Sequence, residues 1–215
     1  TLSFGIPLIP HALSVWSRTG IDRVFLTAFV STSATGMYTV AFQIASILYI
    51  FCVAFNKAYA PFLYKKLANL IEVEKVKLVR YTYLYFLSLL FFALILSLTA
   101  PFIVELFLGS SFYDSLKYIS LLSFSFAFQG MYIMIVNYIL FVKKTAYLSY
   151  VSLSISLFHI GLSYLLIKLN GTLGAAQATL ISSITTFLCV WWLSNKVHKM
   201  PWNLLLATKK NNSYN

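Results

Sequence analysis

Six long apolar segments constrain the fold of this chain more than any other feature of its sequence. A membrane-spanning α-helix needs about 20 mostly apolar residues, and each segment reaches or exceeds that length. In hydrocarbon the backbone groups must bond within their own segment, so we expect helices. We predict an all-α integral membrane protein in which residues 1–215 form a single membrane domain, an antiparallel six-helix bundle. The predicted spans are residues 3–30, 36–56, 82–104, 118–142, 146–168 and 173–194.

The composition agrees with a membrane location. Hydrophobic residues make up 60% of the chain and charged residues 10%, whereas soluble domains carry about 25% charged residues. In so apolar a chain, the formal net charge of +11 indicates membrane topology before nucleic-acid binding, and we expect no nucleic-acid partner. Cys52 and Cys189 lie inside apolar segments and are interpreted as small core residues. The chain starts at Thr1 rather than Met, and we expect it to be part of a longer protein.

Every second connection between the predicted spans is basic. Lysine and arginine gather in residues 57–80, at Lys143 and Lys144, and from Lys196 onward. The positive-inside rule places these connections in the cytoplasm, together with both ends of the chain. Within residues 57–80, leucines recur at helical spacing after Pro61, which predicts a separate amphipathic helix on the membrane surface.

The first predicted span carries charged residues. Arg18, Asp22 and Arg23 lie within it, and Arg18 and Asp22 are four residues apart, where they can pair on one helical face. Ser14 and His11 extend this face into a polar stripe. Charged side chains within a membrane segment usually face a protein interior or a wet cavity. The alternative is an interfacial segment whose arginines reach the headgroups.

The last two predicted spans each contain a stripe of small residues at three- and four-residue steps. Such residues let membrane helices approach closely, so we predict that both stripes are buried between helices. Alternatively, the serine stripe, which includes His159, lines a polar cavity. The stripes are Ser149, Ser152, Ser156, His159 and Ser163, and Ala175, Ala178, Ser182, Thr185 and Cys189.

Isolated polar side chains also occur within the spans. Gln43 lies in the second span, and Gln129 and Asn137 lie in the fourth. Because polar groups in hydrocarbon need partners, we expect these side chains to face inward and to bond neighbouring helices.

No catalytic signature is visible in the sequence. The chain has five acidic residues and lacks HExxH, GxSxG, CxxC and a glycine-rich phosphate loop. The histidines, His11, His159 and His198, do not have the spacing of metal ligands. We therefore expect neither enzymatic activity nor a resident cofactor or metal.

Several phrases together resemble the C-terminal half of a bacterial O-antigen flippase. They are G-x-P-x-x-P at Gly5–Pro10, the pair Asp22-Arg23, G-x-Y-x-V-A-x-x-I-A at Gly36–Ala45, AFNKAYAPF at Ala54–Phe62, Pro101-Phe102, and FLGSSFYDS at Phe107–Ser115. These Wzx-type transporters belong to the multidrug/oligosaccharidyl-lipid/polysaccharide exporter superfamily. The likeness covers nearly all of the chain and is densest in residues 1–62. The family has two six-helix bundles, and this chain supplies one.

The resemblance implies alternating-access transport of an undecaprenyl-pyrophosphate-linked oligosaccharide, an O-antigen or capsule repeat unit, across the bacterial inner membrane. It implies as partners the lipid bilayer, an N-terminal six-helix bundle, and the polymerase and chain-length regulator of polysaccharide assembly. It also implies a coupling ion, either a proton or sodium.

The resemblance further implies a cavity with fixed cations, because guanidinium groups bind phosphate oxygens bidentately. Arg18 is the first candidate for the pyrophosphate site, and Arg23, Lys57 and His11 are further candidates. Asp22 would orient Arg18 or bind the coupling ion. The alternatives are an ion-coupled multidrug exporter of the same superfamily, a membrane enzyme of polysaccharide assembly, and a non-transporting membrane subunit that binds partners through its basic helix.

Overall fold

A computed structural model describes residues 20–68 and 72–203, which form helices joined by short turns and contain no strand. Residues 20–29 are helical and lead into α3 (Thr32–Ala68) and α4 (Glu72–Phe107). A short 3₁₀ helix, η1 (Ser110–Ser115), precedes α5 (Leu116–Phe141), α6 (Thr145–Asn170) and α7 (Thr172–Val197). The prediction of an all-α protein is confirmed for this part of the chain.

Five helices, α3 to α7, are long and apolar enough to cross a membrane. They correspond to the second through sixth predicted spans. Of the first predicted span, residues 3–30, the structure describes only the part from residue 20 onward. The multi-pass membrane character is therefore supported, while the first predicted span and the second bundle remain predictions.

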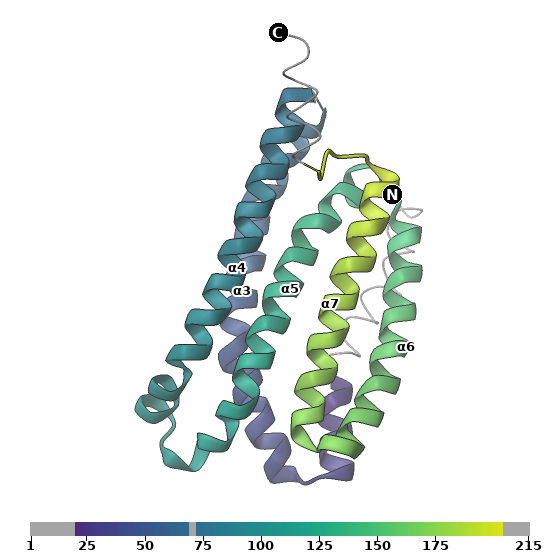
Figure 1. Cartoon of the computed structure of the whole chain (residues 1–215). Helices are drawn as coiled ribbons and strands as arrows, with labels where there is room; N and C mark the ends of the chain where they lie inside the picture. The colour runs from purple at the N-terminus through teal and green to yellow at the C-terminus, as the bar shows by residue number, and fades with distance from the viewer. Residues whose placement is uncertain (1–19, 69–71, 204–215) are drawn as a thin grey trace.

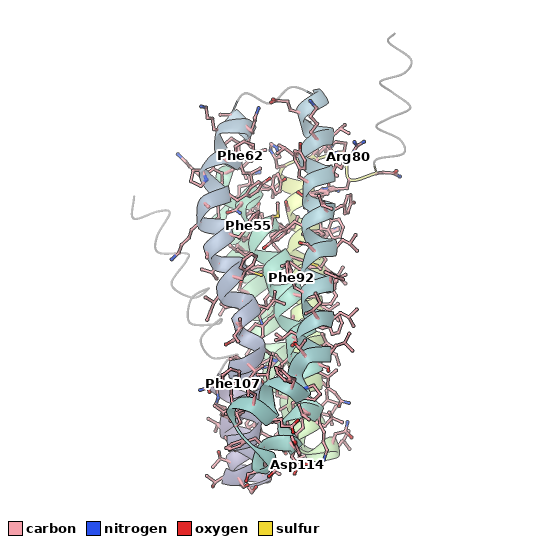
Figure 2. The ribbon with its side chains drawn as sticks, turned by 90° about the vertical axis from the view of Figure 1, so that its left-hand side faces the viewer. Phe55, Phe62, Arg80, Phe92, Phe107 and Asp114 are labelled. Carbon is pink, nitrogen blue, oxygen red and sulfur yellow. The ribbon has the colours of Figure 1, made fainter. Side chains whose placement is uncertain are left out.

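Helix α5 is the centre of the antiparallel bundle. It packs against α3, α4 and α7, and α6 packs on the far side of α7 (Figure 1). Helices α3 and α4 lie side by side on one face of α5, as Figure 2 shows. The close approach to α5 depends on Gly130, where a Cβ atom would collide with the Sγ atom of Cys52 on α3 and lie 2.8 Å from a methyl carbon of Leu89 on α4. Small residues at helix crossings are the usual means of close packing in membranes.

The predicted surface helix in residues 57–80 is wrong. Pro61 lies inside α3, which continues unbroken to Ala68, and α4 begins at Glu72. The leucines assigned to the membrane surface, Leu63 and Leu67, are buried in the same core cluster as Leu78 and Val79 of α4. Burial of this apolar face in the core offsets the cost of a proline inside a helix, about 3 kcal/mol.

The two ends of the bundle differ in charge. Arg80 lies at one end and Asp114 at the other, as labelled in Figure 2. We call the end with Arg80 the basic end and the end with Asp114 the opposite end. The opposite end carries Glu105, Asp114, Lys117 and Lys168. The asymmetry agrees with the predicted topology, in which the basic end is cytoplasmic. The basic end carries Lys65, Lys66, Lys75, Lys77, Arg80, Lys143, Lys144, Lys196 and Lys199.

Candidate functional site: a buried carboxylate between membrane helices

Asp22 is the buried acidic residue around which the candidate site is built. It lies on the helix formed by residues 20–29, and only 2% of its surface is exposed. A charged side chain inside a membrane segment costs about 2.5–3.5 kcal/mol or more to insert. A carboxylate so placed requires hydrogen-bond donors from its neighbours.

Three hydroxyl groups from three helices donate to the Asp22 carboxylate. Ser163 of α6 donates to Oδ1 at 2.6 Å, and Thr179 of α7 donates to Oδ2 at 2.8 Å. Tyr38 of α3 donates to Oδ2 at 3.1 Å. One carboxylate therefore joins four helices, the one at residues 20–29 and α3, α6 and α7.

His159 of α6 completes the network. Its Nε2 atom lies 3.3 Å from Asp22 Oδ1 and 3.4 Å from Ser163 Oγ, and its Nδ1 atom lies 2.9 Å from Ser182 Oγ on α7. Because Ser163 donates its one hydrogen to Asp22, both Nε2 contacts are favourable only when Nε2 carries a hydrogen. We therefore assign the Nε2–H tautomer to the neutral ring, with Ser182 as donor to Nδ1.

This arrangement accommodates an additional proton without moving any heavy atom. A proton on Nδ1 of His159 reverses the bond to Ser182, whose oxygen can accept as well as donate. A proton on Asp22 removes an acceptor from Thr179, whose hydroxyl also lies 3.0 Å from the backbone oxygen of Ala175. Each protonation state of the pair therefore has partners within hydrogen-bonding distance.

The network lies within the membrane, toward the opposite end of the bundle. Tyr38 follows the start of α3 by six residues, and Thr179 follows the start of α7 by seven. At a rise of 1.5 Å per residue, this is about 10 Å from the helix ends. A 26-residue helix such as α7 is about 39 Å long, against about 30 Å of hydrocarbon. With α7 centred on the hydrocarbon, Asp22 lies roughly 5 Å inside its boundary.

The predicted site residues do not all gather at Asp22. The Nε atom of Arg23 donates to Thr39 Oγ1 at 3.3 Å, and its guanidinium lies 4.8 Å from the ring centre of Phe42. Lys57 is exposed on α3, toward the basic end. Arg18 and His11 lie outside the described residues, so the proposed pair Arg18–Asp22 stays a prediction.

The burial of the α6 stripe is confirmed, and that of the α7 stripe is confirmed in part. All five residues of the α6 stripe are buried, as are Ala175, Ala178 and Ser182 of α7. Thr185 and Cys189 are only half-buried because they lie toward the outer edge of α7. The α6–α7 hairpin is also tight at Gly174, where a Cβ atom would collide with the backbone oxygen of Leu166.

Two of the isolated polar residues bond neighbouring helices as predicted. Gln129 of α5 donates to Ser183 of α7 at 3.3 Å, and Asn137 of α5 donates to Asn56 of α3 at 2.7 Å. The prediction for Gln43 is wrong, because its side chain is exposed on α3. Hydrophobic residues of α3 already face α5 and α7, so the position of Gln43 turns it outward.

Tyr38 and Thr179 are site residues that the sequence did not single out. Tyr38 belongs to the phrase at 36–45, and Thr179 directly follows Ala178 of the α7 stripe. For Thr179 the available signal was its position beside the small-residue stripe, which predicts that it lies near the same helix interface. For Tyr38 the sequence offers no comparable signal.

The comparisons with known proteins give two relatives. One, a Haemophilus influenzae protein named for the Lsg locus, is 26% identical over 198 residues, which cover 92% of this chain and 49% of that protein. Another, named an uncharacterized membrane protein of the same organism, is 31% identical over 160 residues, which cover 74% of this chain and 39% of that protein. The chain thus spans about half the length, or less, of these relatives.

Neither relative's name states an activity. No family model matches the chain, and no solved structure matches it. The relative named as a membrane protein agrees with the apolar helices of the structure. The chain is a multi-pass, all-α membrane protein with a buried Asp–His pair between its helices.

Proposed function

We propose that the chain is one half of a transporter that moves a polyprenyl-pyrophosphate-linked oligosaccharide across the bacterial inner membrane by alternating access. The observation that carries this proposal is the buried Asp22–His159 pair, with its hydroxyl donors on three helices. Ionisable residues inside membrane segments are typical of proton relays and transport pathways. The length of the relatives, about twice that of this chain, agrees with a second bundle.

In this proposal Asp22 and His159 bind the coupling proton. With Asp22 ionised, its charge-assisted bonds hold the helix at residues 20–29 against α6 and α7, and each is worth about 1.5–3 kcal/mol. Protonation of Asp22 keeps the same partners but replaces these charge-assisted bonds with weaker neutral ones, which lowers the free energy needed to separate the helix from its neighbours and shifts the transporter toward its other state. The location of the pair near the opposite end favours proton entry from the periplasm.

The substrate head group in this proposal is bound by cations. Arg23 lies within the predicted first span, and its guanidinium plane is held by Thr39 and by the Phe42 ring. A fixed guanidinium suits the planar, bidentate recognition of phosphate oxygens. In the predicted first span the two arginines, Arg18 and Arg23, outnumber the one acidic residue, Asp22, which favours an anionic substrate.

An ion-coupled multidrug exporter is the second candidate, because a buried acidic residue could bind a cationic drug. This candidate is less favoured, because Asp22 is 2% exposed and already bonded to four side chains, so a drug would not reach it in this conformation. Drug-resistance measurements separate the two candidates. The exporter predicts that cells lacking the protein become sensitive to organic cations, and the flippase predicts loss of surface polysaccharide.

Complementation of surface polysaccharide by the full-length protein, normalised to its membrane level, tests the proposal. Asp22→Asn keeps the shape of the side chain and removes its charge, and should abolish display while the protein still accumulates. Arg23→Lys keeps the charge but loses the planar fork, and should impair display in part. Gln129→Leu is the control because it removes an inter-helix hydrogen bond without an ionisable group. Full display with Asp22→Asn would exclude Asp22 from transport.

A further inference from the structure

The outer surface between α6 and α7 has a groove near the basic end. One hollow of about 460 Å³ lies over Tyr150, Ser154 and Ile155 of α6 and Cys189 of α7. A second, of about 310 Å³, lies over Trp191, Asn195 and Trp202. Both hollows are also lined by Leu188 and Trp192, so they lie side by side along α7, and together we call them the α6–α7 groove.

The lining of the groove changes with depth in the membrane. Tyr150 lies five residues after the start of α6, and Trp192 lies five residues before the end of α7, a depth of about 7–8 Å from the basic end. Ile155, ten residues into α6, lies at about 15 Å. Aromatic side chains therefore form the rim close to the hydrocarbon boundary, where tyrosine and tryptophan are favoured, and the floor lies deeper in the hydrocarbon.

A positive charge lies at the rim. The Nζ atom of Lys196 is 5.3 Å from the ring centre of Trp192, and its side chain is exposed. Asn195 and Lys199 are exposed beside it. An ammonium group at headgroup level, above an apolar floor, complements a phosphodiester joined to an acyl chain.

We propose that the α6–α7 groove binds an anionic phospholipid, with its phosphate at Lys196 and one acyl chain along Ile155 and Leu188. The groove between α3 and α4 offers a useful contrast. It has a volume of about 250 Å³ and is lined by apolar residues and one threonine, including Phe51, Phe92 and Thr99, with no charged residue. Within the described part of the chain, no charged residue lines the α6–α7 groove either, but Lys196 lies beside it, at the ring of Trp192. The α3–α4 groove therefore suits any acyl chain, whereas the α6–α7 groove also selects a headgroup. This site is independent of the proposed transport function.

Three of the four tryptophans surround this site, so tryptophan emission can report its occupancy. The full-length protein, in which Trp16 and every tryptophan outside this chain are replaced by phenylalanine, is reconstituted in phosphatidylcholine vesicles. A small fraction of the lipid is replaced by dibrominated phosphatidylglycerol or, at the same fraction, by dibrominated phosphatidylcholine. Bromine quenches tryptophan at contact. We expect brominated phosphatidylglycerol to quench more strongly, with an apparent preference of roughly five-fold from one lysine near the surface.

Two variants separate the site from general attraction to the basic end. Lys196→Gln should reduce the preference to near unity, whereas Lys65→Gln removes the same charge from the exposed surface of α3 and should leave it unchanged. Ser154→Phe fills the floor and should weaken quenching by both lipids. Equal quenching by the two lipids in the parent protein would overturn the proposal, as would an unchanged preference in Lys196→Gln. Absence of quenching by either lipid would also overturn the proposal, because it would show that lipid does not reach the groove.

Discussion

At the scale of single residues, variants of Asp22 and His159 test whether the site takes part in transport or only holds the helices together. His159→Leu removes a donor that lies 3.3 Å from the buried Asp22 carboxylate, and a buried group left without a partner costs about 1–3 kcal/mol, or more when it is charged. His159→Leu should therefore lower the amount of folded protein in the membrane. The double change Asp22→Leu with His159→Leu removes both groups and should restore that amount, because apolar residues replace a buried pair at little cost.

The double variant separates two roles of the pair. If the pair binds the coupling proton, the restored protein should remain inactive in polysaccharide display. If the pair only holds helices together, display should return with protein level. Quantitative immunoblotting of membranes, together with the display assay, gives both readings from the same cells.

Residue chemistry could be predicted from the sequence more easily than residue partners. Asp22 and His159 were both recognised as ionisable residues in spans, but the predicted partner of Asp22 was Arg18, four residues away. Pairing within one helix follows from helical spacing alone. Pairing across 137 residues, as for Asp22 and His159, depends on the rotation of each helix in the bundle, which hydrophobic periodicity does not specify when most faces are apolar.

At the scale of elements, the packing of α5 against α3 makes a specific prediction. Gly130→Leu places a side chain where Cys52 and Leu89 already lie, and overfilling of this kind costs about 1–3 kcal/mol. The thermal midpoint of the purified protein should therefore fall. Gly161→Leu is the control, since a Cβ atom on this exposed α6 glycine meets no atom within 4 Å. Equal midpoints for the two variants would contradict the close contact at Gly130.

The helix boundaries show where sequence reasoning fails at this scale. The second through sixth predicted spans correspond to α3 to α7, because runs of about 20 apolar residues are a strong signal. The ends were missed where α3 and α4 continue past the apolar run. Leucines at helical spacing have the same pattern whether they face lipid headgroups or another helix, and the buried Leu63 and Leu67 face the core.

At the scale of the whole molecule, the charge asymmetry predicts the orientation. Single cysteines at Lys66→Cys and Ser110→Cys, in a background with Cys52→Ala and Cys189→Ala, place one label at each end of the bundle. In intact cells an impermeant maleimide should react with the cysteine at 110 and reach the one at 66 only after permeabilisation. Equal labelling of both cysteines in intact cells would contradict the proposed topology.

The central claim is that the Asp22–His159 pair couples proton movement to the transport of an anionic lipid-linked oligosaccharide. The most direct measurement is translocation of that lipid by the full-length protein in proteoliposomes under an imposed pH gradient. We predict that the rate of the parent protein and of Gln129→Leu depends on the direction of the gradient, and that Asp22→Asn loses both this dependence and most of the rate. Translocation by Asp22→Asn at the parent rate, with the same response to the gradient, would contradict the account.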